Sequence, residues 1–425
     1  DDLTGLECFV ELDYLQVGRT GVTDLTPISE LAKLENLRLH STGVSDLEPL
    51  RNLSKLRWLR LSKTYIGSVE PISGLTSLEE LHLNDTAVTD ISPLSALVNL
   101  ETLEIHEMAS CKPDCGTGSA EFASANKLTS LLALGEMSEL RRLEARENAI
   151  SNISVLTATL SSGSRVHQNL YHINLENNLL TSVAPLAGLN ALTTLYAGGN
   201  ELGTLTDILT LTGLEHLSAE NTGLTSTEGI SALLFLNDLN LNDNPNLNGQ
   251  LIDLHDLVYL EYLNLNNVGL TDIPDVSEMT SLRNLSMENN QSLTSLSSGV
   301  RYESGGGVVP VDSPIEGHSG IESLSVSWSS LLSLNGIGTM SQLRYLSIGG
   351  NRLSSLAGLG TLPSLVDLYA PENRLTNIDD LVGATNIETI YLRNNRLQSL
   401  PEAGVLAEWT DLTYLNVESN DLTTD

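Results

Sequence analysis

The sequence predicts a solenoid in which short strands from about seventeen stacked repeats form one curved parallel β-sheet, with turns and 3₁₀ segments on its convex face. Three observations predict it. A period of 22 residues runs through the chain, aliphatic residues recur at fixed places in each period, and a Thr or Asn recurs between them. Internal repeats take precedence over chain length, so we expect residues 1–425 to form a single domain.

Each repeat follows the pattern L-x-x-L-x-L-x-x-(T/N)-x-(L/V/I), which is typical of leucine-rich repeats. The last repeat is cut short. We therefore expect a leucine-rich-repeat solenoid. The repeats start at Leu12, Leu34, Leu56, Leu78, Leu100, Leu140, Leu170, Leu192, Leu214, Leu236, Leu260, Leu282, Ile321, Leu343, Leu365, Ile387 and Leu412.

The first half of each repeat is expected to be a strand. Positions 1, 4 and 6, such as Leu34, Leu37 and Leu39, should point into the core because side chains alternate about a strand, while positions 2, 3, 5, 7 and 8 face solvent. Position 9 is Thr in the first four repeats and Asn in most repeats from Asn148 onward. A side chain there can bond backbone groups at the turn leaving the strand, so we interpret this column as structural.

The second half of each repeat is expected to return along the convex side. Its aliphatic residues are three apart, as in Val44, Leu47 and Leu50, which favours turns or 3₁₀ backbone over a full helix. Residues 24–28, 46–50 and 90–94 share the form D-(L/I)-x-P-(L/I), in which the proline fixes the bend.

These bends, the period and the Thr/Asn column resemble the internalin family of bacterial surface proteins over almost the whole chain. The resemblance implies ligand binding on the concave sheet. The same short repeat also resembles cytosolic phosphatase-regulating scaffolds, so the shared fold leaves more than one function open.

Three insertions interrupt the period, near residues 108–127, 157–169 and 297–320. The first leaves directly after a strand, so ligand contact and a tolerated insertion are both open; for the third we expect flexible decoration. Residues 1–11 fit the convex half of a preceding repeat or a cap remnant, and no cap is recognisable at either end. We expect further protein on both sides.

The net charge of −33 repels nucleic acid and anionic lipid, which argues against partners of either class. No apolar run approaches the length that spans a bilayer. The acidic surplus is compatible with plain solubility or with collected divalent cations, and we predict no cofactor, calcium being possible but unsupported. We expect an extracellular or cell-surface protein whose signal segment has been removed, with a cytoplasmic one as the alternative.

Two of the three cysteines, Cys111 and Cys115, lie close together in the first insertion. A local disulfide would indicate an oxidising compartment, and two free thiols are the alternative.

A basic cluster around one tryptophan stands out in the first three repeats. Arg and Trp are favoured in protein hot spots, and an acidic partner or a sulfated glycan would suit the charge. The alternative is local salt bridging with Glu79, Glu80 and Asp85. The cluster comprises Arg19, Arg38, His40, Arg57, Trp58, Arg60 and Lys63.

Aromatic residues mark the last repeats. We expect these residues to occupy outward strand positions in five successive repeats. Large amphipathic rings at such positions commonly face a ligand; the alternative is that the rings only cover the strands. These residues are Trp328, Tyr345, Tyr369, Tyr391 and Tyr414.

A carboxylate-rich stretch in the middle repeats could hold calcium or meet a basic partner, but solvated repulsion is the simpler interpretation. It comprises Glu101, Glu104, Glu107, Glu144, Glu147 and Glu176. Residues 244–249 superficially resemble a calcium loop, yet its twelfth position is His255 rather than a bidentate Glu. We interpret that segment as a repeat turn with one or two extra residues.

No P-loop, nucleophile-elbow or H-E-x-x-H motif occurs. His82, Glu104 and His106 should lie near one another, but an open sheet neither excludes water nor shifts their pKa values much, so we expect no catalytic role and no enzyme.

The first hypothesis is therefore a secreted or cell-surface recognition or adhesion protein that binds a protein or glycan through its concave face. The alternatives are a cytosolic scaffold or enzyme regulator, and a structural envelope component that self-assembles edge to edge.

Overall fold

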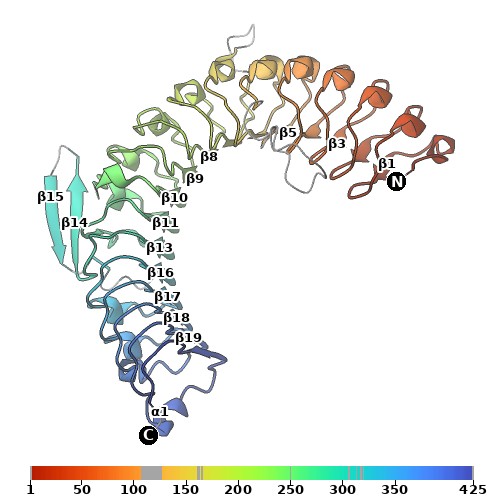
Figure 1. Cartoon of the computed structure of the whole chain (residues 1–425). Helices are drawn as coiled ribbons and strands as arrows, with labels where there is room; N and C mark the ends of the chain where they lie inside the picture. Colours follow the sequence, from red (N-terminus) through yellow and green to blue (C-terminus); the bar gives the residue numbers. More distant parts are fainter. Residues whose placement is uncertain are drawn as a thin grey trace. The chain divides into compact units, whose positions relative to one another are not determined.

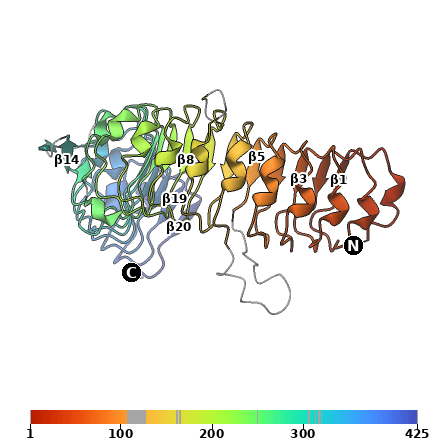
Figure 2. The same cartoon turned by 90° about the horizontal axis from the view of Figure 1, so that it is seen from above.

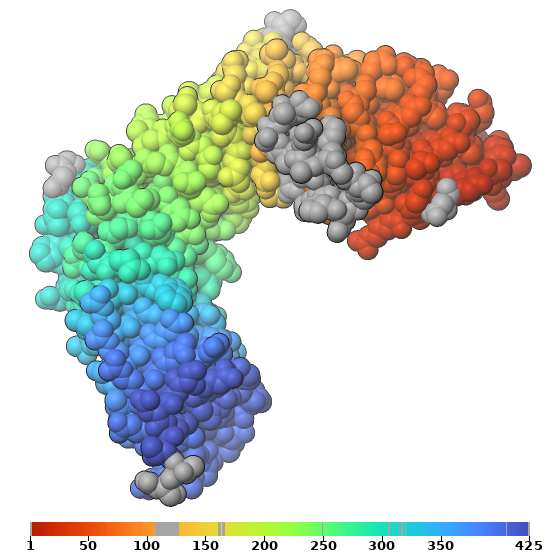
Figure 3. Space-filling view, viewed as in Figure 1, coloured from red at the N-terminus to blue at the C-terminus, as the bar shows by residue number. Residues whose placement is uncertain are grey.

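The computed structural model describes residues 2–106, 127–159, 163, 166–248, 250–304, 307–312, 314–315, 318 and 320–423. The chain divides into two compact units, Asp1–Leu202 and Gly203–Asp425. In each unit the strands line the concave side and the 3₁₀ segments the convex side (Figure 1). Consecutive repeats of a unit follow one another as adjoining bands of atoms (Figure 3). Cys111, Cys115 and Glu107 lie outside the described residues.

The described part of unit 1 contains eight three-residue strands that pair in parallel, each in register with the next along the chain. They are β1 (Tyr14–Gln16), β2 (Asn36–Arg38), β3 (Trp58–Arg60), β4 (Glu80–His82), β5 (Thr102–Glu104), β6 (Arg142–Glu144), β7 (His172–Asn174) and β8 (Thr194–Tyr196).

Unit 2 contains nine strands with the same parallel pairing. With the eight of unit 1 they make the seventeen repeat strands that the sequence predicts. They are β9 (His216–Ser218), β10 (Asp238–Asn240), β11 (Tyr262–Asn264), β13 (Asn284–Ser286), β16 (Ser323–Ser325), β17 (Tyr345–Ser347), β18 (Asp367–Tyr369), β19 (Thr389–Tyr391) and β20 (Tyr414–Asn416).

The core lies between the strands and the return segments. Leu34, Leu37 and Leu39 are completely buried, as the alternation about the strand predicts. Leu415 in the last strand is 37% exposed, and the equivalent Leu15 in β1 is half-buried. Burial in this solenoid therefore depends on having a repeat on both sides.

The return segments are 3₁₀ helices, as the three-residue spacing predicts. Asp24 Oδ1 accepts a hydrogen bond from the Thr26 amide at 2.8 Å, and Asp46 and Asp90 likewise accept from the amide of the residue just before their own prolines. The aspartate and the proline of the D-(L/I)-x-P-(L/I) motif thus fix the bend together.

The 3₁₀ segments are η1 (Leu6–Cys8), η2 (Thr26–Ile28), η3 (Glu48–Leu50), η4 (Glu70–Ile72), η5 (Ser92–Ala96), η6 (Leu132–Glu136), η7 (Ser154–Thr157), η8 (Ala184–Leu186), η9 (Ile208–Thr210), η10 (Ile230–Ala232), η11 (Pro245–Leu247), η12 (Leu254–Asp256), η13 (Ile337–Thr339), η14 (Leu359–Thr361) and η15 (Asp379–Leu381). One short α-helix, α1 (Ala403–Leu406), precedes β20.

The Thr/Asn column is structural, as expected. Asn200 Nδ2 donates to the carbonyls of Leu175 and Ala197 at 2.9 Å, and its Oδ1 accepts from the Leu180 amide at 3.0 Å. Each such Asn therefore joins its own turn to the preceding repeat. Asn244 makes the same bonds and η11 follows it, so the segment from Asn244 to Asn248 is a repeat turn, while Gly249 lies outside the described residues.

The residue just before this column adopts a left-handed backbone in every repeat where the structure describes it. Examples are Ser41 at φ 58°, Asn394 at φ 58° and Gly199 at φ 67°. The left-handed turn redirects the chain from the strand towards the convex return. The sequence signal for it is weak, because Arg19, Lys63 and Trp328 occupy the same position as Asn and Gly.

The third insertion forms an ordered hairpin in place of the flexible decoration that we expected. β14 (Ser298–Glu303) and β15 (Gly307–Asp312) pair antiparallel, and β14 also pairs with β12 (Ile273–Pro274). The hairpin projects from the turn side of unit 2 (Figures 1 and 2). Arg301 Nε donates to Asp275 Oδ2 at 2.7 Å and thereby fastens β14 to the solenoid.

Candidate binding surfaces

Four tyrosines form one continuous row across β17, β18, β19 and β20, which we call the tyrosine row. Ring centroids of successive members lie 5.4, 6.2 and 6.4 Å apart, and the last two pairs are stacked. Tyr414 is 48% exposed and the other three are half-buried. The predicted outward strand positions are confirmed for Tyr345, Tyr369, Tyr391 and Tyr414.

Trp328 does not belong to this row. It lies three residues after β16 in the left-handed turn, at φ 57°, so its predicted strand position is wrong. Its ring packs over Gly350, where an added Cβ would lie 2.4 Å from the indole. Trp328 is still 47% exposed, but it sits at the edge of the sheet rather than on a strand.

Hydroxyl groups border the tyrosine row. Ser327 Oγ lies 2.8 Å from Ser347 Oγ, beside Tyr345. Burial raises the pKa of Tyr345, so its phenol stays protonated and can donate a hydrogen bond at neutral pH. The row therefore combines apolar ring faces with neutral polar groups.

In the basic cluster of unit 1, two arginines are neutralised by neighbouring glutamates. Arg57 donates twice to Glu79, at 2.9 Å each, and its guanidinium lies 4.5 Å from the centre of the Trp58 ring. Arg60 donates to Glu80 at 2.7 Å. The salt-bridge interpretation therefore holds for Arg57 and Arg60.

Arg38 is different. Its guanidinium lies 5.4 Å from the centre of the Tyr14 ring, and no residue that the structure describes forms an ion pair with it. Its Nε is buried without a hydrogen-bond partner. Arg38 lines a shallow hollow of about 230 Å³ together with Asn36, Trp58, Arg60 and Glu80.

His40 lies beside this hollow, and its ring packs over Gly18. Burial lowers the pKa of His40, and the positive charges of Arg19, Arg60 and Arg38 lower it further. The ring is therefore neutral at pH 7, and the surrounding potential is positive.

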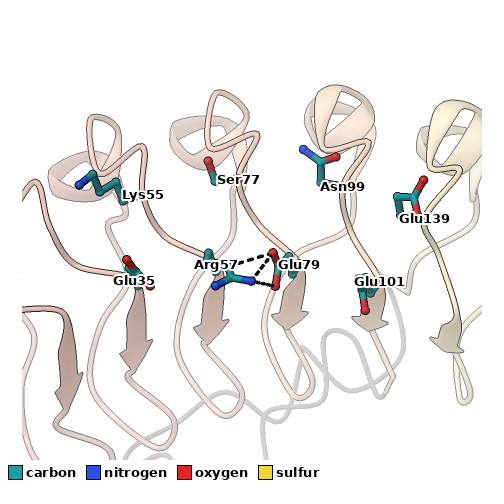
Figure 4. A pocket seen from close by; sticks show the side chains of 8 residues that line it. All are labelled: Glu35, Lys55, Arg57, Ser77, Glu79, Asn99, Glu101 and Glu139. Atoms are coloured by element: carbon teal, nitrogen blue, oxygen red, sulfur yellow. Dashed lines mark hydrogen bonds and ion pairs between the residues drawn. The ribbon is translucent and has the colours of Figure 1, made fainter.

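A second hollow, of about 430 Å³, runs along the edge where strands β2–β5 begin. Figure 4 shows two rows of side chains, one at the strand entries and one just before them, with the Arg57–Glu79 pair at the centre. It is mixed in charge and mostly acidic. Its lining residues are Glu35, Lys55, Arg57, Ser77, Glu79, Asn99, Glu101 and Glu139.

The carboxylate-rich stretch is hydrogen-bonded and ion-paired, which corrects the expectation of solvated repulsion. Glu104 and Glu144 are register neighbours on β5 and β6. Glu104 Oε2 lies 2.6 Å from His82 Nδ1, while Glu144 pairs with Arg142 and lies 2.7 Å from His172 Nε2. Two more pairs are Glu101 with Arg141 and Glu147 with Arg146. Glu176 follows β7.

These contacts shift pKa values on the open sheet, contrary to our expectation. Burial alone would raise the pKa of Glu104, but hydrogen bonding and charge from His82, with a hydrogen bond from Asn84, lower it to about 2. Burial, followed by the charge of Arg146, lowers the pKa of His106. On this open sheet, neighbouring charged and hydrogen-bonding side chains shift the pKa values, as a closed pocket does in other proteins.

At pH 7 Glu104 is ionised and His106 is neutral, so these two groups do not form an acid–base pair. Across the described part of the chain, no group of three or more His, Cys, Asp or Glu side chains is arranged to hold a metal ion. No helix among the described residues is long and apolar enough to cross a bilayer.

Comparisons with known proteins agree with this architecture. A family model for leucine-rich repeats, built from two copies of the repeat, matches residues 54–95. No curated protein sequence matches the chain significantly. A leucine-rich-repeat protein of Leptospira interrogans is 19% identical at a TM-score of 0.67, over 99% of this chain and 94% of that one.

Two further solved structures are similar. The ectodomain of the Arabidopsis thaliana receptor kinase GASSHO1/SCHENGEN3 is 19% identical at a TM-score of 0.64, over 98% of this chain and 51% of that one. Internalin F of Listeria monocytogenes is 20% identical at a TM-score of 0.46, over 99% of this chain and 89% of that one. The repeat pattern, the parallel strands, the family-model match and the Leptospira structure establish that the chain folds as a leucine-rich-repeat solenoid of about seventeen repeats.

Proposed function

We propose that this chain is a recognition or adhesion protein of internalin type, which binds a protein partner through its strand face outside the cell. The observation that carries the proposal is the tyrosine row of unit 2. Tyrosine is favoured in protein hot spots because it combines a large apolar area with a hydrogen-bonding hydroxyl.

The stacking of the row supports binding on energetic grounds. The rings of Tyr369, Tyr391 and Tyr414 already lie against one another. Less side-chain freedom is then lost when a partner covers them, so more of the contact energy appears as affinity. A polypeptide with apolar side chains and free backbone amides matches the ring faces and the neutral hydroxyls.

The similar fold of the plant receptor is consistent with a polypeptide partner. That ectodomain was crystallised in complex with Casparian strip integrity factor 2. The experiment below distinguishes a protein partner from a glycan partner. We assign no catalytic role to the strand face.

The test replaces Tyr369, Tyr391 and Tyr414 together by alanine in the full-length protein. A photocrosslinking residue is placed at Thr389, on β19 beside the row, in both the parent and the triple variant. Crosslinked products from cell-surface extracts are identified by mass spectrometry. We expect the parent to capture one protein reproducibly and the triple variant to lose it, with little change in melting temperature.

The matched control replaces Tyr65, Tyr171 and Tyr259, three exposed tyrosines outside the row. Capture should survive in this control. Equal capture by the row variant and the parent would remove the row as the binding surface, and a crosslinked glycan in place of a protein would contradict the partner class.

The location is tested separately, by fractionating the native host cells and mapping peptides under non-reducing conditions. We expect the protein in the medium or on the cell surface, with Cys111 joined to Cys115. Reduced thiols in a cytosolic fraction would instead support the scaffold alternative.

A further inference from the structure

We propose that Arg38 on β2 is an anchor for a single carboxylate of the partner, supplied either by an acidic side chain or by the partner's carboxyl terminus. The inference rests on the proposed function only in taking the partner to be a protein. It concerns unit 1 and is argued independently of the tyrosine row.

The first step is that Arg38 has been left without an anion. Six of the arginines that the structure describes in unit 1 form ion pairs with carboxylates, namely Arg51, Arg57, Arg60, Arg141, Arg142 and Arg146. Arg19 and Arg38 do not. The Nε of Arg38 is buried, and its terminal Nη groups make no hydrogen bond with any residue that the structure describes, so these Nη groups are the donors that a carboxylate would meet.

The second step is that Arg38 is held in place. Its guanidinium lies against the Tyr14 ring, and Trp58 and Arg60 form the other side of the hollow. A guanidinium presents parallel N–H groups that match the two oxygens of a carboxylate, and a supported guanidinium loses less freedom on binding.

The third step is that the electrostatic potential around Arg38 is positive, although the protein has a net charge of −33. The charges of Arg19, Arg60 and Arg38 all act on His40, so the positive potential converges at this end of unit 1. Glu80 already neutralises Arg60, which leaves the free positive charge on Arg38 and Arg19.

The fourth step favours one carboxylate over a polyanion. A sulfated glycan laid across successive strands would pass from Arg38 to Arg60 and His82 and then to two glutamates, Glu104 and Glu144. Arg60 and His82 are already paired with Glu80 and Glu104. The cations that follow Arg38 in this column are therefore occupied and offer a polyanion no further partner, whereas a single carboxylate needs only the hollow at Arg38.

The experiment follows the arginine Nε–H signals of the full-length protein, labelled with ¹⁵N-arginine, and assigns Arg38 by its loss in Arg38→Lys. Three probes are titrated: an amidated peptide of three glutamates, an apolar peptide with a free C-terminal carboxylate, and a heparin hexasaccharide. We expect one of the two peptides to shift the Arg38 signal saturably and the heparin fragment to bind more weakly. The peptide that binds identifies the source of the carboxylate.

Arg38→Ala should weaken binding of that peptide on the order of tenfold, and Arg38→Lys should not restore it, because an ammonium lacks the paired N–H groups. Arg51→Ala removes the same charge from the turn side and should leave binding unchanged. An Arg38 signal that moves with neither peptide, or tighter binding of heparin, would overturn the inference. Partner capture that survives Arg38→Ala but not the tyrosine variant would overturn this inference while leaving the proposed function intact.

Discussion

At the scale of single residues, this protein depends on side chains that bond to the backbone. A repeat of 22 residues turns back on itself twice, and the buried peptide groups at those turns need partners that no regular helix or sheet provides. Asn200 supplies three such bonds across two repeats. The amide is suited to this place because it both donates and accepts, whereas Thr42 only reaches the carbonyl of its own turn.

Replacing Asn200 by alanine should therefore lower the free energy of unfolding by about 2 to 4 kcal/mol, because one buried amide and one buried carbonyl lose their partner, while the Leu175 carbonyl keeps its bond from Asn178. Urea unfolding followed by circular dichroism measures the change. Asn190→Ala, on the exposed surface of the same repeat region, should shift the transition by less than about 0.5 kcal/mol. Equal shifts in both variants would show that the Thr/Asn column does not stabilise the turn.

Glu104 gives a second prediction at this scale. Its pKa of about 2 lies below the ordinary 4.5, so its ionised form stabilises the fold above pH 4.5, and this contribution is lost as the pH falls towards 2. Replacing His82 by leucine removes the largest contribution that opposes burial, while the hydrogen bond from Asn84 remains, so the pKa of Glu104 should rise towards its ordinary range. A carboxyl-carbon NMR titration measures it, and a midpoint that stays near 2 would show that His82 is not the cause.

At the scale of elements, the hairpin of β14 and β15 shows how an insertion is fastened to a solenoid. Asp275 is only 3% exposed and accepts hydrogen bonds from Ser277 and Arg301. Asp253 likewise accepts from Ser304 at 2.6 Å. Two aspartates from the solenoid thus hold the second half of β14 and the residue that follows it, and apolar contacts contribute less because Val308 and Val309 on β15 are exposed.

The contact between Asp275 and Arg301 predicts a pH-dependent hairpin. Burial alone would raise the pKa of Asp275, but Ser277 and Arg301 lower it below the ordinary 3.8. The stabilisation is therefore complete above pH 3.8 and is lost as the pH falls through the lower folded value. Asp275→Asn removes the carboxylate that pairs with Arg301, so this stabilisation should already be absent at neutral pH.

Hydrogen exchange at the amides of β14 measures the effect. Exchange there should quicken in Asp275→Asn while the amides of β17 stay protected. Asp272→Asn, at a neighbouring carboxylate that forms no ion pair with Arg301, is the matched control. Unchanged exchange in β14 would show that strand pairing with β12 holds the hairpin without the aspartate.

At the scale of the whole molecule, stability is shared between neighbouring repeats. Leu239 is completely buried between two repeats, whereas the equivalent Leu415 of the last strand is 37% exposed. Leu239→Ala should lower the free energy of unfolding by about 2 to 5 kcal/mol, and Leu415→Ala by about 1 kcal/mol or less. Thermal unfolding of the two variants measures both losses of stability. Equal losses would mean that β20 is covered in solution.

The sequence by itself determined the repeat, the seventeen strands, the buried positions and the bonding role of the Asn column. Each of these follows from the chemistry of one residue type at one place in a period, and Leu37 or Asn200 would do the same in any repeat. It also located the four tyrosines on strands and the basic cluster. These features are local, so a pattern read along the sequence is sufficient to find them.

Only the tertiary structure decided which groups on the strand face are occupied and which are free. Arg57 and Arg60 are bound by Glu79 and Glu80, while Arg38, in the same column as Arg60, has no ion-pair partner among the residues that the structure describes. The tertiary structure also shows that Trp328 lies in a left-handed turn and that the glycine-rich insertion forms a hairpin. The physical reason is that side chains of adjacent repeats compete for the same partners across the strands, and that competition depends on three-dimensional positions rather than on the period.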